Sequence, residues 1–139
     1  MALQYSEALR NAQLDAWETI IGASPILRLY AEAPSANTAA AAPATCIAEG
    51  NLPADFAGAA AAGSKTILNG PFSVTGLPAA STGTNALSYR IYASDGITCH
   101  EQGVVTTTGG GGEMTMDNVN VADAQSLNVN TMTRNAGNA

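Results

Sequence analysis

The hydrophobic and polar positions along the chain predict one N-terminal helix followed by a series of short strands. From Leu3 to Ile21 the apolar residues recur every three or four positions, which is helical spacing, and Gly22 stands where a helix would end. We therefore expect a helix over residues 3–22. Its core-facing stripe is predicted to consist of Tyr5, Ala8, Leu9, Ala12, Ala16 and Ile20.

A second apolar strip lies on the other side of this helix and consists of Leu14, Trp17 and Ile21. A helix with two apolar sides needs two surfaces to pack against. Either both sides are buried within the fold, or the second strip meets another subunit. Trp17 is the only tryptophan of the chain, and tryptophan is enriched at the energetic centres of interfaces. Leu14, Trp17 and Ile21 are therefore the candidate subunit interface.

Alternation of apolar and polar residues after the helix predicts about seven or eight short strands, separated by glycine, proline and asparagine clusters. The loop from Ser35 to Ala44 is rich in alanine without apolar periodicity, so we expect it to lie on the surface with little reason to dock. Residues 55–62 suggest a brief helical turn. The predicted strands cover residues 26–32, 46–52, 65–68, 72–76, 87–94, 97–106, 113–117 and 125–133.

Two consecutive β-hairpins are predicted between Leu87 and Asn118. Asp95 and Gly96 suit a two-residue turn, because this pair readily adopts the positive backbone angles that such a turn needs. The second hairpin is expected to reverse through the glycine run 109–112. If Ser94 pairs with Ile97, the first hairpin sets three pairs opposite each other: Tyr92 with Cys99, Ile91 with His100, and Arg90 with Glu101.

Together these elements predict a mainly β fold in one domain. We expect an antiparallel β-sandwich of jelly-roll or immunoglobulin-like type with one N-terminal α-helix, because a single layer of this length would leave too much apolar surface exposed. The domain covers residues 1–139, with the helix over 3–22, the sandwich over 26–133 and a tail over 134–139.

The small number of charged residues limits the classes of partner. Charged side chains make up 12% of the chain, against about 25% in an ordinary soluble protein, and the net charge is −6. The five lysines and arginines are scattered singly, which argues against nucleic acid as a partner. We find no pattern of a signal peptide and no apolar run that spans a membrane.

The residues that carry chemistry are few, and we expect no enzyme, no cofactor and no metal site. His100 is the only histidine, and its neighbour Cys99 points to the opposite face of the same strand. Cys46 and Cys99 are expected to be free thiols, since the chain shows no sign of export. A calcium ion is the lesser alternative for the oxygen-rich loop that holds Asp117, Asn118, Asn120 and Asp123, because such turns need no ion.

Three segments carry a resemblance to a known class of protein. They are MALQYSEALRNAQLDAWETIIGASPILRLY, YRIYASDGITCHEQGVV and TTTGGGGEMTMDN. In combination they resemble small virion-associated structural proteins of tailed bacteriophages.

The resemblance implies a capsid decoration, or cement, protein that is present in many copies and docks by shape and apolar contacts. Such a protein is made in the host cytoplasm without a signal peptide and ends on the virion. Its implied partners are copies of itself, as a homo-oligomer, and other virion proteins such as the major capsid or tail protein. The alternatives are a tail or collar accessory protein, or a β-sandwich module that binds a host-surface glycan or receptor.

Overall fold

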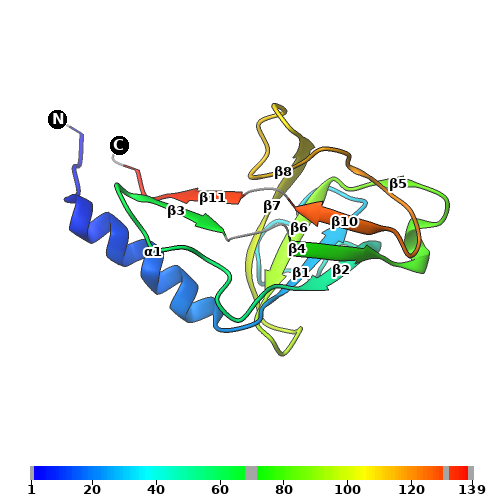
Figure 1. Cartoon of the computed structure of the whole chain (residues 1–139), viewed down its shortest axis with the longest axis horizontal. Coiled ribbons are helices and arrows are strands. Elements are labelled where there is room, and N and C mark those ends of the chain that lie inside the picture. The colour runs from blue at the N-terminus through cyan, green and yellow to red at the C-terminus, as the bar shows by residue number, and fades with distance from the viewer. Residues whose placement is uncertain (1, 68–71, 130–131, 138–139) are drawn as a thin grey trace.

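The structure, a computed structural model, describes residues 2–67, 72–129 and 132–137, which form a mainly β fold with one N-terminal helix (Figure 1). Helix α1 spans Glu7–Ile21 and begins later than predicted. Ser6 sets this start, because its side chain accepts a hydrogen bond from the N–H of Leu9 and so caps the first turn. Gly22 ends the helix with a φ of 81°.

Seven strands form one curved sheet in the order β10-β4-β2-β1-β6-β7-β8. Its two edge strands, β10 and β8, lie against each other, so the sheet is a nearly closed barrel. The strands are β1 Ile26–Tyr30, β2 Cys46–Asn51, β4 Phe72–Gly76, β6 Ser88–Tyr92, β7 Cys99–Thr107, β8 Met114–Met116 and β10 Ser126–Val129. Fully buried residues fill the interior, among them Leu27, Leu29, Ile47, Val74, Ile91, Met114 and Val129.

Two small sheets and a short helix complete the fold. Strand β3, Ser64–Ile67, pairs with β11, Met132–Asn135, and strand β5, Thr84–Asn85, pairs with β9, Asn120–Val121. The 3₁₀ helix η1 spans Pro78–Ala80. Helix α1 packs against β3. Together α1, β3 and β11 form one end of the molecule, where both termini lie (Figure 1).

The predicted mainly β domain with one N-terminal helix is confirmed, whereas the jelly-roll or immunoglobulin-like sandwich is not confirmed, since seven strands belong to one sheet. The last predicted strand is divided into β10 and β11, with residues 130–131 outside the described part. The predicted tail is partly wrong, because β11 extends to Asn135. Residues 55–62 contain no helical turn; Phe56 there is fully buried, and Ala57 bridges to Ile67.

The second predicted hairpin is wrong, because β7 and β8 are parallel, with Val105 opposite Met114. After Thr107 the glycine-rich loop runs back along β7. It is held there by the hydroxyl of Thr106, which accepts from the N–H of Gly112 at 3.0 Å. The carboxylate of Glu113 accepts from the N–H of Val104 at 2.8 Å. This return path places Met114 in the core, where no part of its surface is exposed.

The first hairpin begins in the predicted register and then slips by one residue. The Tyr92–Cys99 pair is confirmed, but a bulge follows at His100, so Glu101 faces Ile91 and the predicted Arg90–Glu101 pair is wrong. An extra residue in one strand turns every later side chain to the other face of the sheet. The bulge therefore moves Glu101 from the outer face to the inner face.

The alanine-rich loop is docked on the sheet, contrary to prediction. Gln102 donates from Nε2 to the backbone oxygen of Ser35 at 2.7 Å, and Arg90 donates to three further carbonyls of the same loop. Docking therefore depends on backbone oxygens, which need no apolar periodicity in the loop itself.

Candidate functional site

Helix α1 has two apolar sides, and the structure reverses their predicted assignment. Leu14 and Ile21 are only 6% and 2% exposed, and Trp17 packs on the core with its ring 5.6 Å from that of Phe56, edge to face. The candidate interface Leu14, Trp17 and Ile21 thus lies inside the chain's own fold. Leu14 and Ile21 are buried and offer no surface to another subunit, and half-buried Trp17 packs on the core, so we now expect this strip to stabilise the fold.

A buried polar cluster explains why this side of the helix faces inward. Trp17 donates from Nε1 to Glu101 Oε2 at 2.9 Å, and the hydroxyl of Tyr89 donates to Glu101 Oε1 at 2.6 Å. Arg134 donates from Nε to both oxygens of the same carboxylate, at 2.9 and 3.0 Å. Four elements, α1, β6, β7 and β11, meet in this cluster.

The members of the cluster satisfy one another's hydrogen bonds and connect four elements, so we call the cluster a structural joint. The Glu101 side chain is only 14% exposed and that of Arg134 16%, so their pairing offsets the cost of removing both charges from water. Burial raises the pKa of the Tyr89 phenol, which therefore stays protonated and donates its hydrogen bond. With these donors bound to it, the carboxylate is poorly placed to act as an acid or base on a substrate.

A second ion pair joins the helix to β3. The Lys65 side chain is 2% exposed and its Nζ lies 2.6 Å from Asp15 Oδ1 and 2.7 Å from Glu18 Oε2. Burial alone would lower the pKa of Lys65, but the hydrogen bonds to these two carboxylates outweigh burial and raise it. Lys65 therefore stays charged and fixes the rotation of α1 about its own axis.

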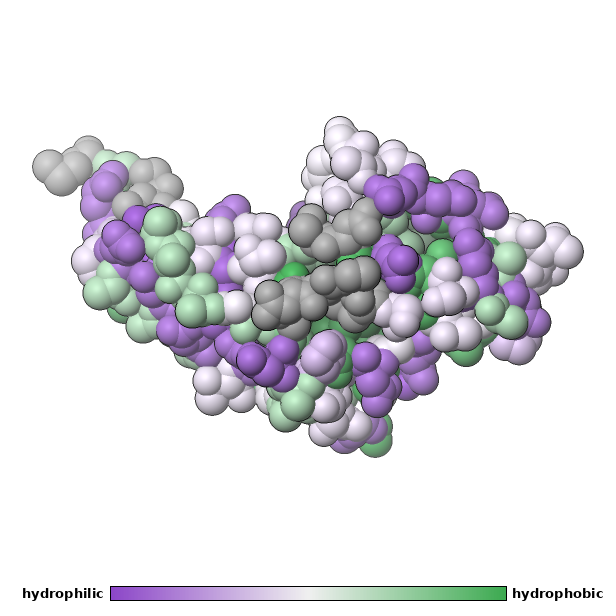
Figure 2. Space-filling model, viewed as in Figure 1, coloured by the Kyte–Doolittle hydropathy of each residue, from purple (hydrophilic) through white to green (hydrophobic). Residues whose placement is uncertain are grey.

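The opposite side of α1 carries the apolar residues that were predicted to face the core. We call Leu9, Ala12, Ala16 and Ile20 the outer stripe, and all four are exposed. Leu9 is 46% and Ile20 66% exposed. In Figure 2, green apolar residues lie among purple polar ones along α1. A row of exposed apolar side chains on a rigid helix is typical of a contact surface.

The residues with reactive side chains are dispersed. His100 is half-buried at the bulge of β7. Cys46 and Cys99 are both free, and burial raises the pKa of each thiol. Cys46 lies opposite Tyr30, at the C-terminal end of β1. Cys99 lies opposite Tyr92, which itself lies opposite Ile26 at the N-terminal end of β1, so the two cysteines are at opposite ends of this strand.

The oxygen-rich loop uses its side chains for its own turns. Asn118 accepts from the N–H of Asn120 at 2.9 Å, and Asn120 donates to Asn85 at 3.0 Å. Asp117 accepts from the hydroxyl of Thr108. In the described ranges no three residues among histidine, cysteine, aspartate and glutamate are grouped as metal ligands.

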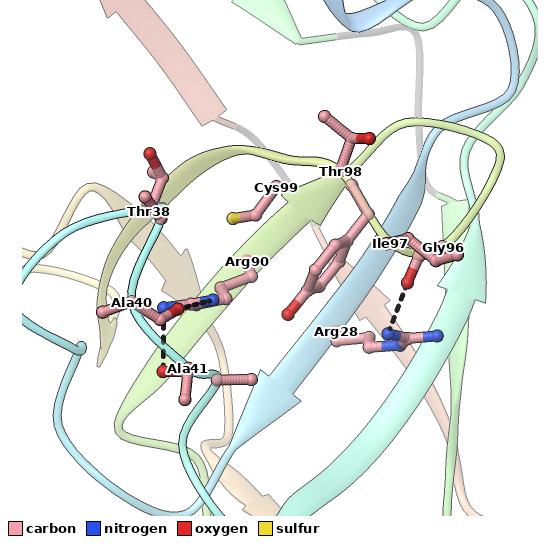
Figure 3. Close-up of a pocket in the computed structure, with 12 residues that line it drawn as sticks. Arg28, Thr38, Ala40, Ala41, Arg90, Gly96, Ile97, Thr98 and Cys99 are labelled. Atoms are coloured by element: carbon pink, nitrogen blue, oxygen red, sulfur yellow. Dashed lines mark hydrogen bonds between the residues drawn. The ribbon is translucent and has the colours of Figure 1, made fainter.

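An open pocket of about 630 Å³ lies on the outer face of the sheet, between the alanine-rich loop and the turn that joins β6 to β7 (Figure 3). Arg28 and Arg90 line it from adjacent strands. Sequence reasoning missed both, because a single arginine in an alternating strand resembles any solvent-facing residue. Only the pairing of β1 with β6, which sets the two arginines opposite each other, reveals them.

Comparison with protein-family models, with curated protein sequences and with solved structures finds no match to this chain. Over the described residues, no helix has the length and apolar character needed to cross a membrane. The inference of function therefore rests on the resemblance stated above and on the surfaces of the fold.

Proposed function

We propose that this chain is a structural component of a tailed-phage virion, most simply a capsid decoration protein present in many copies. The single observation that supports the proposal is the outer stripe of α1. It exposes Leu9 and Ile20 on a helix whose other side is fixed to the fold. A rigid apolar stripe suits docking by shape and apolar contact to another virion protein or to a second copy of the chain.

The low charge of the molecule agrees with this mode of docking. Charged residues are depleted at the centres of protein interfaces, and the outer stripe contains none. The proposal does not depend on a jelly-roll or immunoglobulin-like sandwich, since the docking surface belongs to the helix. A tail or collar accessory protein remains the alternative within the same class and would use the same stripe.

A glycan- or receptor-binding module is less well supported by the aromatic residues. Such modules display aromatic rings on their surface. Here Phe56, Tyr30, Tyr89 and Tyr92 are each at most 4% exposed, and Trp17 packs on the core. Within the described ranges no cluster of exposed rings is available to stack on a sugar.

The test is incorporation of a stripe variant into phage particles. Ile20→Asp places a charge in the centre of the proposed contact, so we expect about a tenfold or greater loss of binding to particles that lack the protein. Its melting temperature should stay close to that of the unmodified protein, because Ile20 is 66% exposed. Co-sedimentation with purified particles measures binding, and an electron-microscopy map gives position and copy number.

The matched control is Thr107→Asp, which adds the same charge at an exposed position of β7 far along the chain from the helix. It should bind particles as the unmodified protein does. Equal binding of Ile20→Asp and Thr107→Asp would contradict the role of the stripe. Detection of the protein in lysates but never in purified virions would refute the structural function altogether.

A further inference from the structure

The outer face of the barrel carries two arginines directly opposite each other, Arg28 on β1 and Arg90 on β6. Like charges in this arrangement repel, so each needs compensation. Arg28 has it: its Nε lies 2.5 Å from Glu49 Oε2, and its guanidinium lies 4.8 Å from the centre of the Tyr92 ring. Arg28 also donates from Nη1 to the carbonyl of Gly96 at 3.0 Å.

Arg90 is compensated by no carboxylate among the described residues. It is 3% exposed, and its guanidinium donates to the carbonyls of Ala40 at 3.1 Å, Asn37 at 3.2 Å and Ala41 at 3.3 Å. Its Nε is buried without a hydrogen-bond partner. Carbonyl dipoles offset only part of the cost of burying a charge, so one positive charge remains unbalanced at this place.

The pocket above these arginines combines this charge with an apolar rim (Figure 3). Ile97 stands on the rim and is 82% exposed. The small side chains of residues 39–42 form the opposite wall, and Thr38 and Thr98 add hydroxyl groups. Asp95 lies in the same turn, but its carboxylate accepts hydrogen bonds from Ile97 and Thr98 within that turn.

We propose that this pocket binds a carboxylate carried by a peptide segment of a partner protein. Arg28 supplies it with an N–H donor, since Arg28 Nη2 has no hydrogen bond within the described part of the chain, and Arg90 supplies the uncompensated positive charge in the pocket wall. Guanidinium groups bind carboxylates with good geometry and strength. The Arg28–Glu49 pair is neutral, so a single negative charge balances Arg90, whereas a phosphate dianion exceeds that balance.

The apolar rim explains why the carboxylate should belong to a peptide. Ile97 and the alanines can contact the aliphatic groups beside an acidic side chain, and this contact adds burial that a free small acid does not offer. The nature of the partner as a virion protein rests on the proposed function; the binding of a peptide carboxylate does not.

A capped alanine- and leucine-containing peptide with one glutamate is the probe, titrated into ¹⁵N-labelled full-length protein. We expect saturable shifts of the backbone amides of Gly96 and Ala40. Arg28→Gln should weaken binding about tenfold, because it removes one charge-assisted partner. Glu49→Gln should strengthen binding several-fold, since it removes the carboxylate that competes for Arg28, and a loss of fold does not produce such a gain.

Arg10→Gln is the matched control, since it removes the same charge from α1 and should leave binding unchanged. Equal binding of the peptide with glutamine in place of glutamate would overturn the proposal. Tighter binding of a peptide with phosphoserine in place of glutamate would show that the pocket binds phosphate and not carboxylate. Equal affinity for acetate alone would show that the peptide around the carboxylate does not contribute to binding. If the glutamate peptide does not bind while Ile20→Asp still blocks particle incorporation, the pocket proposal fails and the proposed function stands.

Discussion

Asp95 shows at the scale of one residue how a side chain determines the width of a turn. Its Oδ1 accepts from the N–H groups of Ile97 and Thr98 at 2.8 and 2.9 Å, and its Oδ2 accepts from the hydroxyl of Thr98 at 2.8 Å. Gly96 takes the positive φ, 68°, that the Asp-Gly pair predicts. The side-chain bonds nevertheless hold a wider loop, closed by the N–H of Ala93 on the carbonyl of Thr98.

This turn gives the protein a defined dependence on pH. The hydrogen bonds from the N–H groups of Ile97 and Thr98 hold the pKa of Asp95 below its ordinary value of 3.8. The folded state therefore prefers the ionised form. The ionised Asp95 carboxylate stabilises the fold fully well above pH 3.8, the ordinary pKa of this group. This stabilisation is lost as the pH falls through 3.8 and then through the lower pKa of Asp95 in the folded state.

Asp95→Asn should lower the melting temperature relative to the unmodified protein at neutral pH. In acid the two melting temperatures should become equal. The asparagine keeps an acceptor for the turn but has no proton equilibrium, so the two proteins should converge as the pH falls below 3.8. Thermal melts from pH 7 to acid, followed by circular dichroism, measure the difference. Parallel curves over the whole range would show that Asp95 is not responsible.

At the scale of elements, the bulge in β7 decides which residues face the core. Cys99, before it, lines the outer pocket beside Tyr92, whereas Glu101, after it, bonds Tyr89 and Trp17 on the inside. Without the extra residue His100, consecutive side chains would still alternate between these two faces. The bulge thus accommodates the extra residue His100 and, with that residue present, keeps Glu101 directed inward.

Deletion of His100 should therefore preserve the fold. Cys99 and Glu101 become neighbours in a regular ladder and keep their present faces, so a single cooperative melt is expected. Deletion of Gln102 is the control: a regular ladder then sets Glu101 opposite Arg90 on the outer face, so the bonds of Glu101 to Trp17 and Tyr89 are lost and the melting temperature should fall further than in the His100 deletion. Melts of the two deletions by circular dichroism decide the point, and an unfolded His100 deletion would contradict it.

The sequence predicts elements well where the local pattern is sufficient. The alternation in 26–32 and 46–52 corresponds to β1 and β2, and Ser6 and Gly22 delimit a helix that the apolar spacing already indicates. It fails where two arrangements satisfy the same pattern. The glycine run permits an antiparallel or a parallel return, and the burial of Met114 in the core selects the parallel one.

The candidate site was harder to predict than the fold, because it depends on distant partners. Both sides of α1 are apolar, and the choice of the inner one depends on Phe56, Glu101 and Lys65, which lie far along the chain. Arg90 gives no local sign that it binds the backbone of the alanine-rich loop. Tertiary contacts decide which side of the helix is buried and what Arg90 binds, and the periodicity of apolar residues along the chain gives no information about those contacts.

At the scale of the whole molecule, the end formed by α1, β3 and β11 shares the hydrophobic core of the barrel and is also tied to the barrel by a few polar side chains. Trp17 and Arg134 bind one carboxylate of β7, Glu101, from the helix and from the last strand. Lys65 ties β3 to the helix through Asp15 and Glu18. The position of the outer stripe relative to the barrel therefore depends on this joint.

Trp17→Ala should lower stability without changing the mass of any assembly. It removes a half-buried ring from Phe56 and a hydrogen bond from Glu101, at a cost of about 2–3 kcal/mol. Melting experiments measure the loss, and light scattering measures the mass. A smaller assembly at an unchanged melting temperature would return Trp17 to the role of an interface residue.

The joint has a consequence for synthesis on the ribosome. The first helix is made long before Glu101 and Arg134, which complete its inner contacts. Arg10 likewise donates to the backbone oxygen of Ala136, near the end of the chain. The helix therefore emerges with its inner apolar side uncovered and completes its inner contacts only after Glu101 and Arg134 have been made, so apolar surface stays exposed on the nascent chain during that interval.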